Sequence, residues 1–190
     1  MPVVIDFETK HTFREFSDPA KLQISVAGIY DYASDKGYVF QEHELQGLFN
    51  LIEQASCVIG FNIDEFDLPV LEPYYAGDTK QFYTFDIMQD VREKLGRRLS
   101  LDSIIKATLK KQKTGHGLRA VELFKEKKIE ELSQYCLDDV MLTKELFEYG
   151  VENGEISYLS PVGTTNLAVS WKHYRDGRRK GKDMNLTLPF

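Results

Sequence analysis

The sequence predicts an α/β protein in which helices flank a mixed β-sheet. Two observations support this fold class. Strand-like runs come first and are followed by helices interleaved with short strands, an order typical of α/β layers. The 190 residues are also 42% hydrophobic and 12% aromatic, which is enough for a substantial core. Since no long linker divides the chain, we expect a single domain over 1–190, with a core at 3–150 and a basic C-terminal extension at 151–190.

Local patterns predict the elements in order. Runs of β-branched and aromatic residues predict strands at 3–5, 22–32, 37–40, 57–61 and 82–85, and weaker strands at 156–159 and 165–171. Helical spacing of apolar residues predicts helices at 42–54, 64–75, 87–96, 101–109, 118–125 and 129–149. Pro69 and Pro73 should keep the second of these helices short or irregular. Asp86 and Ser100 are expected to cap the helices that follow them.

Composition argues against membrane-spanning, secreted and disulfide-rich proteins. The formal net charge is −6, but it is unevenly distributed: residues 1–90 carry 16 acids and 5 bases, and residues 91–190 carry 14 acids and 19 bases. The basic half is either part of an uneven solvated surface or a region that binds a polyanion. No apolar run approaches the roughly 18 residues of a membrane span, so no membrane association is expected. The N-terminus lacks the basic start of a secretory signal. Cys57 and Cys136 do not make a disulfide framework, so we expect reduced thiols and a cytoplasmic or otherwise intracellular location.

The first strand ends in two closely spaced acids. Asp6 and Glu8 are two residues apart, and a strand has a period of two, so both carboxylates should project from the same face. Like charges this close repel one another unless a cation lies between them. Mg²⁺ prefers such oxygen ligands. The alternative is a strand end that simply meets solvent.

A second acidic segment follows the strand predicted at 57–61. Asn62 is followed by three acids, Asp64, Glu65 and Asp67. Asn62 or Asp64 could cap a helix, which is a common role for either residue. Asp67 is harder to explain in that way because it lies between Phe66 and Leu68, inside the predicted helix. Its side chain could point back toward the strand ends.

The third segment is the 129–149 helix. Tyr135 and Asp139 share one stripe with Leu142 and Leu146, so this face should be at least half buried. An ionised Asp139 there needs a partner, either a metal ion or a hydrogen bond from Tyr135 one turn away. Asp138 is rotated by about 100° and is expected to be solvated. Brought to one point, the carboxylates of the three segments would form a site for two divalent ions, which serves in-line displacement at phosphorus.

These segments resemble the three sequence motifs of the DEDDy 3′–5′ exonucleases, and they are most similar to the proofreading domain of family B DNA polymerases. The motifs are Asp6-Phe7-Glu8, Asn62-Ile63-Asp64-Glu65-Phe66-Asp67 and Tyr135-Cys136-Leu137-Asp138-Asp139. The resemblance spans residues 3 to about 149. It implies an RNase H-like fold, with a mixed five-stranded sheet flanked by helices and the site at the first strand.

The resemblance also implies roles for individual residues. Asp6, Glu8 and Asp139 would bind the ion that holds the nucleophilic water, and Asp67 would contact a second ion that Asp6 bridges. Both ions would be Mg²⁺ or Mn²⁺. Tyr135 would orient the attacking water. Residues that would shape the pocket for the terminal nucleotides are Phe7, Asn62 and Phe66, although Phe7 could instead pack in the core.

Two basic segments lie outside the motifs. The loop near 110–117 carries Lys110, Lys111, Lys113 and His116, which would either contact the phosphates of a single strand or form a solvated loop. The segment from Trp171 to Lys182 mixes aromatic and basic residues, and it would either stack on bases or form a flexible tail.

The function implied is a metal-dependent 3′–5′ exonuclease that releases nucleoside 5′-monophosphates, with single-stranded DNA favoured as the substrate. The expected partner is the single-stranded 3′ end of a nucleic acid, and a polymerase or a helicase is a further expected partner. Three alternatives stay open. They are an RNA-trimming exonuclease of the same fold, a nuclease-like nucleic-acid-binding module without turnover, and a metal-binding structural domain.

Overall fold

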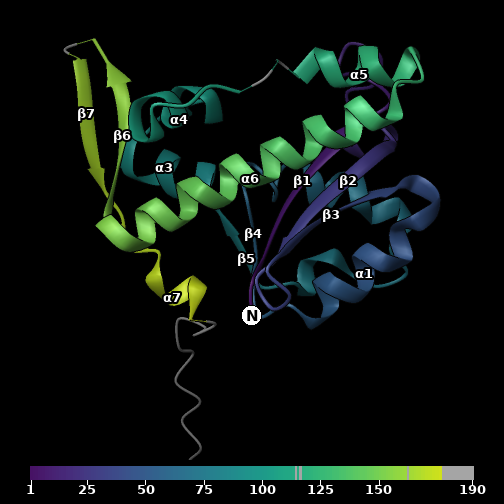
Figure 1. The fold of residues 1–190 in the computed structure, drawn as a ribbon, viewed down its shortest axis with the longest axis horizontal. Coiled ribbons are helices and arrows are strands. Elements are labelled where there is room, and N and C mark those ends of the chain that lie inside the picture. The colour runs from purple at the N-terminus through teal and green to yellow at the C-terminus, as the bar shows by residue number, and fades with distance from the viewer. Residues whose placement is uncertain (114, 116, 162, 177–190) are drawn as a thin grey trace, which may run out of the picture.

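A five-stranded mixed sheet forms the centre of the computed structural model, which describes residues 1–113, 115, 117–161 and 163–176. The strand order is β3-β2-β1-β4-β5, so β1 is central (Figure 1). β1 pairs antiparallel with β2 and parallel with β4, and β4 pairs parallel with β5. The bounds are Val3–Thr9 for β1, Ile24–Asp31 for β2, Lys36–Gln41 for β3, Val58–Gly60 for β4 and Thr84–Asp86 for β5. The predicted mixed five-stranded sheet is therefore confirmed.

Helices cover both faces of this sheet. α6 runs across one face in Figure 1, and α1 lies on the other side of β2 and β3. The helix bounds are Leu45–Gln54 for α1, Ile87–Leu95 for α3, Leu101–Leu109 for α4, Gly117–Lys125 for α5 and Ile129–Asn153 for α6. Alternate side chains of β1 supply the two cores: Val4 packs with residues of α3, α4 and α6, while Val3 and Ile5 pack with α1. The period of two that the sequence predicted for β1 thus decides which residues face α6.

The C-terminal segment forms a hairpin and a short helix. β6 (Glu155–Ser160) and β7 (Gly163–Ala168) make a two-stranded antiparallel sheet that contacts α4, and α7 spans Lys172–Arg175. The strand predicted at 165–171 therefore ends too late. Trp171 is only 1% exposed and is stacked near Phe147, so it belongs to the core and the prediction of a base-stacking role for it is wrong. The remaining basic residues of the tail, 178–182, lie outside the described residues.

The helix predicted at 64–75 is shorter and divided. Residues 62–66 form a turn, α2 spans only Asp67–Leu71, and a 3₁₀ turn follows at Glu72–Tyr74 with Pro73 in its first turn. Asp67 therefore begins a helix and does not lie inside one. The predicted caps of α3 and α4 are confirmed, since Asp86 accepts hydrogen bonds from Met88 and Gln89, and Ser100 accepts one from Ser103. Among the described residues, no helix is long and apolar enough to cross a membrane.

Candidate metal and active site

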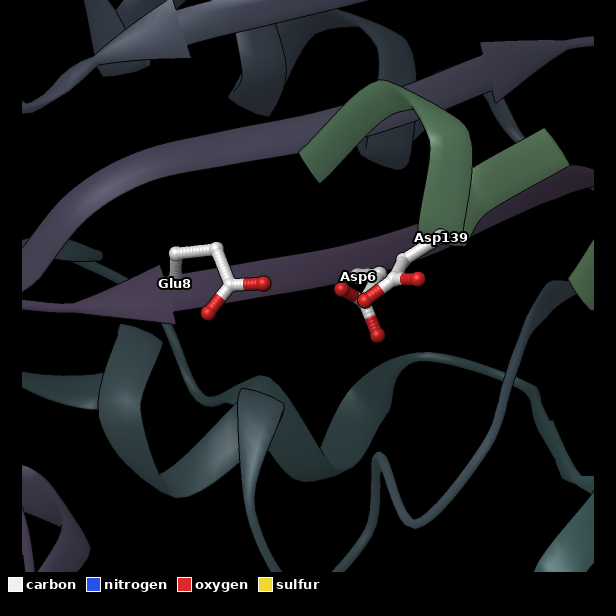
Figure 2. A group of neighbouring side chains, drawn as sticks. All are labelled: Asp6, Glu8 and Asp139. Atoms are coloured by element: carbon white, nitrogen blue, oxygen red, sulfur yellow. The ribbon is translucent and has the colours of Figure 1, made fainter. Parts of the chain in front are cut away.

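β1 carries two acids on the face that looks toward α6. Val4 on this face is buried, and Asp6 and Glu8 continue the same alternation toward the end of the strand. Figure 2 shows both side chains leaving β1 on the same side, with the Glu8 carboxylate turned toward Asp6. The apolar residues at the start of the strand pack in the core, and the two acids toward its end lie at the border of the core.

α6 brings Asp139 to the same point. The helix approaches the sheet closely at Gly28, which pairs with Asp6 across β1 and β2. A Cβ atom at Gly28 would lie 2.7 Å from Val140 Cγ2 and 2.8 Å from Cys136 Sγ, so only glycine permits this approach. The Cys136 thiol donates to the Asp6 carbonyl oxygen at 3.3 Å. This packing fixes the turn of α6 that presents Asp139.

Asp6, Glu8 and Asp139 form a compact acidic cluster. Each offers a carboxylate oxygen, and these oxygens lie within 4.8 Å of one another (Figure 2). The pKa of Asp6 is raised to about 7, chiefly by burial and then by the charge of Asp139. Burial, followed by the charges of Asp6 and Asp139, raises the pKa of Glu8 well above its ordinary value. Three largely buried carboxylates this close repel one another when ionised, and a bound cation would offset that repulsion.

Asp67 lies beside this cluster and is fixed to the strand. Its Oδ1 accepts a hydrogen bond of 2.8 Å from the backbone N–H of Phe7, and the side chain is 2% exposed. Its pKa is raised well above the ordinary value, first by burial and then by the charge of Asp6. Asp67 is not one of the three residues whose oxygens group within 4.8 Å. It ties the start of α2 to β1 between the two motif acids.

Two buried polar atoms without partners indicate that a metal ion would fit this site. Among the described residues, neither Asp139 Oδ1 nor the Tyr135 hydroxyl has a hydrogen-bond partner. Buried polar groups without partners are costly, and a carboxylate oxygen that faces two other acids suits a hard divalent cation. The oxygen donors of Asp6, Glu8 and Asp139 therefore fit Mg²⁺ or Mn²⁺. Asp67 is placed to add a further oxygen next to Asp6.

Lys113 is the cation that faces these acids in the structure. Its Nζ lies 2.7 Å from Asp139 Oδ2, and its side chain is 20% exposed. The charges of Asp6 and Asp139 raise the pKa of Lys113 against the opposing effect of burial. Lys113 therefore belongs to the acidic site and not to an exposed basic loop, which corrects its predicted position.

The other loop residues do not join Lys113. Lys110 Nζ donates to the Ala107 carbonyl oxygen at 2.7 Å, which satisfies the end of α4. Lys111 pairs with Glu145 at 2.5 Å. The structure therefore does not bring the three lysines together, because their side chains make separate contacts, and phosphate binding by this loop stays a prediction. His116, the fourth predicted member, lies outside the described residues.

The three predicted pocket residues are placed differently. Phe66 lines the cavity that contains the acidic cluster. Asn62 has a φ of 70°, its N–H donates to Asp86, and its side chain accepts from Arg98 at 3.0 Å. It therefore shapes the turn before α2 and does not line the cavity. Phe7 also lines the cavity, while most of its side chain, which is 2% exposed, packs in the core on the α1 side.

A cavity of about 560 Å³ opens over the acidic cluster. Its lining includes residues that the sequence interpretation did not select, above all Phe13 and Arg14 after β1 and Leu118 at the start of α5. Phe13 is 56% exposed and Leu118 is 47% exposed. The sequence signal that could have identified Phe13 was an aromatic residue inside the polar segment 10–15, between two predicted strands. No motif included it.

Comparison with known proteins agrees with this architecture. The model of the RNase H superfamily matches residues 3–151. Among solved structures, the chain is similar to the family B DNA polymerase from the hyperthermophilic archaeon Pyrobaculum calidifontis, with a TM-score of 0.59 and 16% sequence identity. The match covers 78% of this chain and 24% of the polymerase chain, so this chain spans about a quarter of that protein. No curated protein matches the chain.

Proposed function

Because this chain belongs to the RNase H superfamily, we propose that it is a metal-dependent 3′–5′ exonuclease. It would hydrolyse the terminal phosphodiester bond of a nucleic acid, with single-stranded DNA favoured, and release nucleoside 5′-monophosphates. The observation that carries the proposal is the grouping of Asp6, Glu8 and Asp139, whose oxygens approach within 4.8 Å beside a cavity of about 560 Å³.

Each residue has a separate task in this proposal. Asp6, Glu8 and Asp139 hold the divalent ions, and Asp67 holds β1 in place through Phe7 N–H while offering an oxygen on the Asp6 side. Two divalent ions at such a site would activate a water molecule and stabilise the leaving oxygen. The Tyr135 hydroxyl, which lacks a hydrogen-bond partner among the described residues, would orient the attacking water.

The contact between Lys113 and Asp139 supports a second candidate function. A lysine already supplies one positive charge to the acids, as expected for a nucleic-acid-binding module that needs no metal and has no turnover. Trimming of RNA by the same residues is the other alternative. As a partner of the active enzyme, we propose a polymerase or a helicase that exposes 3′ ends. We also propose an intracellular location, where nucleic acid is present and the two free cysteines would stay reduced.

Digestion of end-labelled single strands tests the proposal. DNA and RNA strands of equal sequence, labelled at either the 3′ or the 5′ end, are incubated with Mg²⁺, Mn²⁺ or excess chelator. We expect the 3′ label to appear at once as a mononucleotide, and the 5′-labelled strand to shorten gradually, only when metal is present. Faster loss of RNA than DNA would favour the RNA alternative. Binding of the strands without any cleavage would favour the inactive module.

A further inference from the structure

A cavity of about 710 Å³ lies at the opposite end of the sheet from the acidic site. Val58 lines it and pairs with Val3 at the start of β1, whereas Asp6 and Glu8 lie toward the end of that strand. Figure 1 shows the N-terminus, next to the start of β1, and α5, which borders the acidic site, at opposite ends of the sheet. Among the residues that the structure describes, the two cavities share no lining residue, so this cavity is a separate site.

Aromatic rings and a carboxylate line this cavity. Tyr75 and Phe82 are partly exposed, with ring centroids 5.2 Å apart. The Tyr75 hydroxyl donates a hydrogen bond of 2.9 Å to Glu53 Oε1, which holds the carboxylate beside the ring. The Ser56 hydroxyl is buried at the cavity and has no hydrogen-bond partner in the described part of the chain. A ring face and a carboxylate both attract a cation, so this cavity favours a positively charged group.

A second cavity, of about 280 Å³, adjoins the first at Phe82, which lines both. We call the two together the paired cavities. Asp64 and Glu72 line the second cavity. Lys80 is the one lysine or arginine that lines either cavity in the part of the chain that the structure describes. A peptide that crosses Phe82 would therefore meet acids on both sides of this ring.

The acids of the paired cavities have no ion-pair partners. Glu53, Asp64 and Glu72 are exposed, and none of them makes an ion pair with a residue that the structure describes. Glu65, by contrast, is paired with two arginines. Over residues 42–83 the sequence holds eight acids against one lysine and no arginine. The surface around the paired cavities is therefore negative, and its complement is a positively charged partner.

We propose that the paired cavities bind a basic segment of a partner protein, with an arginine or lysine side chain on each side of Phe82. Arginine suits the first cavity best, because its planar guanidinium stacks on a ring while it pairs with the Glu53 carboxylate. A small amine would fill one cavity only, whereas a peptide reaches the acids of both. Nucleic acid would be repelled by the unpaired acids. The proposal is independent of the proposed function, and it assigns these residues to recruitment of the protein.

Binding of a synthetic basic peptide tests the proposal. A fluorescein-labelled peptide of four Arg-Gly repeats is titrated with the full chain, and a second peptide carries citrulline, an uncharged analogue, in place of each arginine. We expect the arginine peptide to bind with an affinity that falls as salt rises, because the contacts are between charges. The citrulline peptide should bind at least about tenfold more weakly, as expected when hydrogen bonds to charged groups are lost.

Substitutions assign the binding to the paired cavities. Glu53→Gln and Tyr75→Leu should each weaken binding of the arginine peptide about 3- to 5-fold, as is typical for one exposed ion pair or cation–π contact. Tyr75→Phe keeps the ring and should retain most of the binding. Glu130→Gln is the matched control, since this exposed carboxylate lies on α6 and lines neither cavity. Release of nucleotide from a free 3′ end should be unchanged in all four variants.

The proposal is overturned if the arginine and citrulline peptides bind alike, or if Glu130→Gln weakens binding as much as Glu53→Gln. It is also overturned if Asp6→Asn abolishes binding, because the peptide would then lie in the acidic site. No binding by the wild type overturns it as well. If binding then appears once the four basic residues of 178–182 are replaced by glutamine, the chain's own segment is the occupant in place of a partner. A protein that binds the peptide but releases no nucleotide would contradict only the proposed function.

Discussion

Two adjacent aspartates of α6 have opposite surroundings. Asp139 is 1% exposed and faces the other motif acids, whereas Asp138 is partly exposed and accepts a hydrogen bond of 2.7 Å from Gln134. Helical spacing alone predicted this difference, because the stripe with Leu142 and Leu146 had to face the core. The contact with Lys113 could not be predicted in the same way, since it depends on the path of an irregular loop.

The Tyr135 hydroxyl should matter for activity and not for stability. Its ring packs with Ala120, Leu123 and Cys136, while the hydroxyl is buried without a partner among the described residues. Tyr135→Phe keeps the packing and removes an unsatisfied polar group, so the free energy of unfolding should stay within about 1 kcal/mol of wild type or rise. The rate of nucleotide release should fall roughly 10- to 100-fold, because water orientation is lost.

Chemical denaturation and single-turnover assays on Tyr135→Phe measure the two quantities separately. A large loss of stability with unchanged turnover would mean that the hydroxyl has a structural partner and no role in the reaction.

Lys113 should stabilise the metal-free protein by offsetting the repulsion among the acids. Lys113→Met leaves Asp139 without its ion-pair partner at 2.7 Å, so we expect a loss of about 3 kcal/mol in chelator, at the low end for a buried pair because Lys113 is 20% exposed. The loss should shrink when Mn²⁺ is added, because the bound ion supplies the missing charge. Thermal melts with and without Mn²⁺ give the comparison.

Lys111→Met is the matched control for Lys113, because Lys111 pairs with Glu145 at the surface and should contribute at most about 1 kcal/mol. Equal losses for the two variants, or a Lys113→Met loss that Mn²⁺ does not reduce, would contradict this role of Lys113.

At the scale of elements, the strands and long helices were predictable and the connections were not. α6 begins at its predicted first residue and continues to Asn153, and β1 begins at its predicted first residue and continues to Thr9. The helix predicted at 64–75 was too long because Asn62 adopts a positive φ and Asp86 binds the backbone N–H groups of Asn62 and Asp64, which holds a turn before Asp67. That long-range contact fixes the position of Asp67, and no local pattern shows it.

The C-terminal segment should depend on Trp171. Its ring stacks near Phe147 at 6.2 Å between centroids and contacts Phe85 at 5.5 Å, and its Nε1 donates to Asp90 at 2.9 Å. Trp171→Ala should lower the free energy of unfolding by about 3–5 kcal/mol, as for other buried aromatics. Gly150→Ala should also lower the free energy of unfolding, because the added Cβ would lie 2.2 Å from the Trp171 ring and displace it.

Hydrogen exchange of 150–176 provides the readout for the Trp171 prediction. Trp171→Phe keeps a ring at this position and serves as the conservative control, so it should retain most of the protection. If exchange in this segment were fast in the wild-type protein and unaffected by Trp171→Ala, the proposed anchoring would be wrong.

At the scale of the whole molecule, the acidic site links stability to pH and metal. The folded-state pKa of Asp6 is raised from 3.8 to about 7, so folding favours its protonated form. Its contribution to stability is present below pH 4 and is lost as the pH rises through about 7. The metal-free protein should therefore lose stability, by a few kcal/mol, between about pH 4 and pH 7.

Melting temperatures across this pH range, with chelator or with saturating Mn²⁺, test the linkage. Mn²⁺ should remove most of the decline, because it binds the ionised carboxylates of the folded protein. Asp6→Asn, which removes the titrating group, should flatten the decline in chelator. A metal-free protein whose stability rose over the same range would contradict the burial of uncompensated acids.

The central claim is that the acids of β1 and α6 form the metal centre of a 3′-end hydrolase. The most direct measurement is the Mn²⁺-dependent rate of mononucleotide release from a 3′-labelled single strand by wild type, Asp139→Asn and Asp138→Asn. We predict that Asp139→Asn loses at least about 100-fold in rate, and that Asp138→Asn, one residue away on the same helix, keeps the wild-type rate. Equal rates for all three proteins, or full activity of the wild type in excess chelator, would contradict the claim.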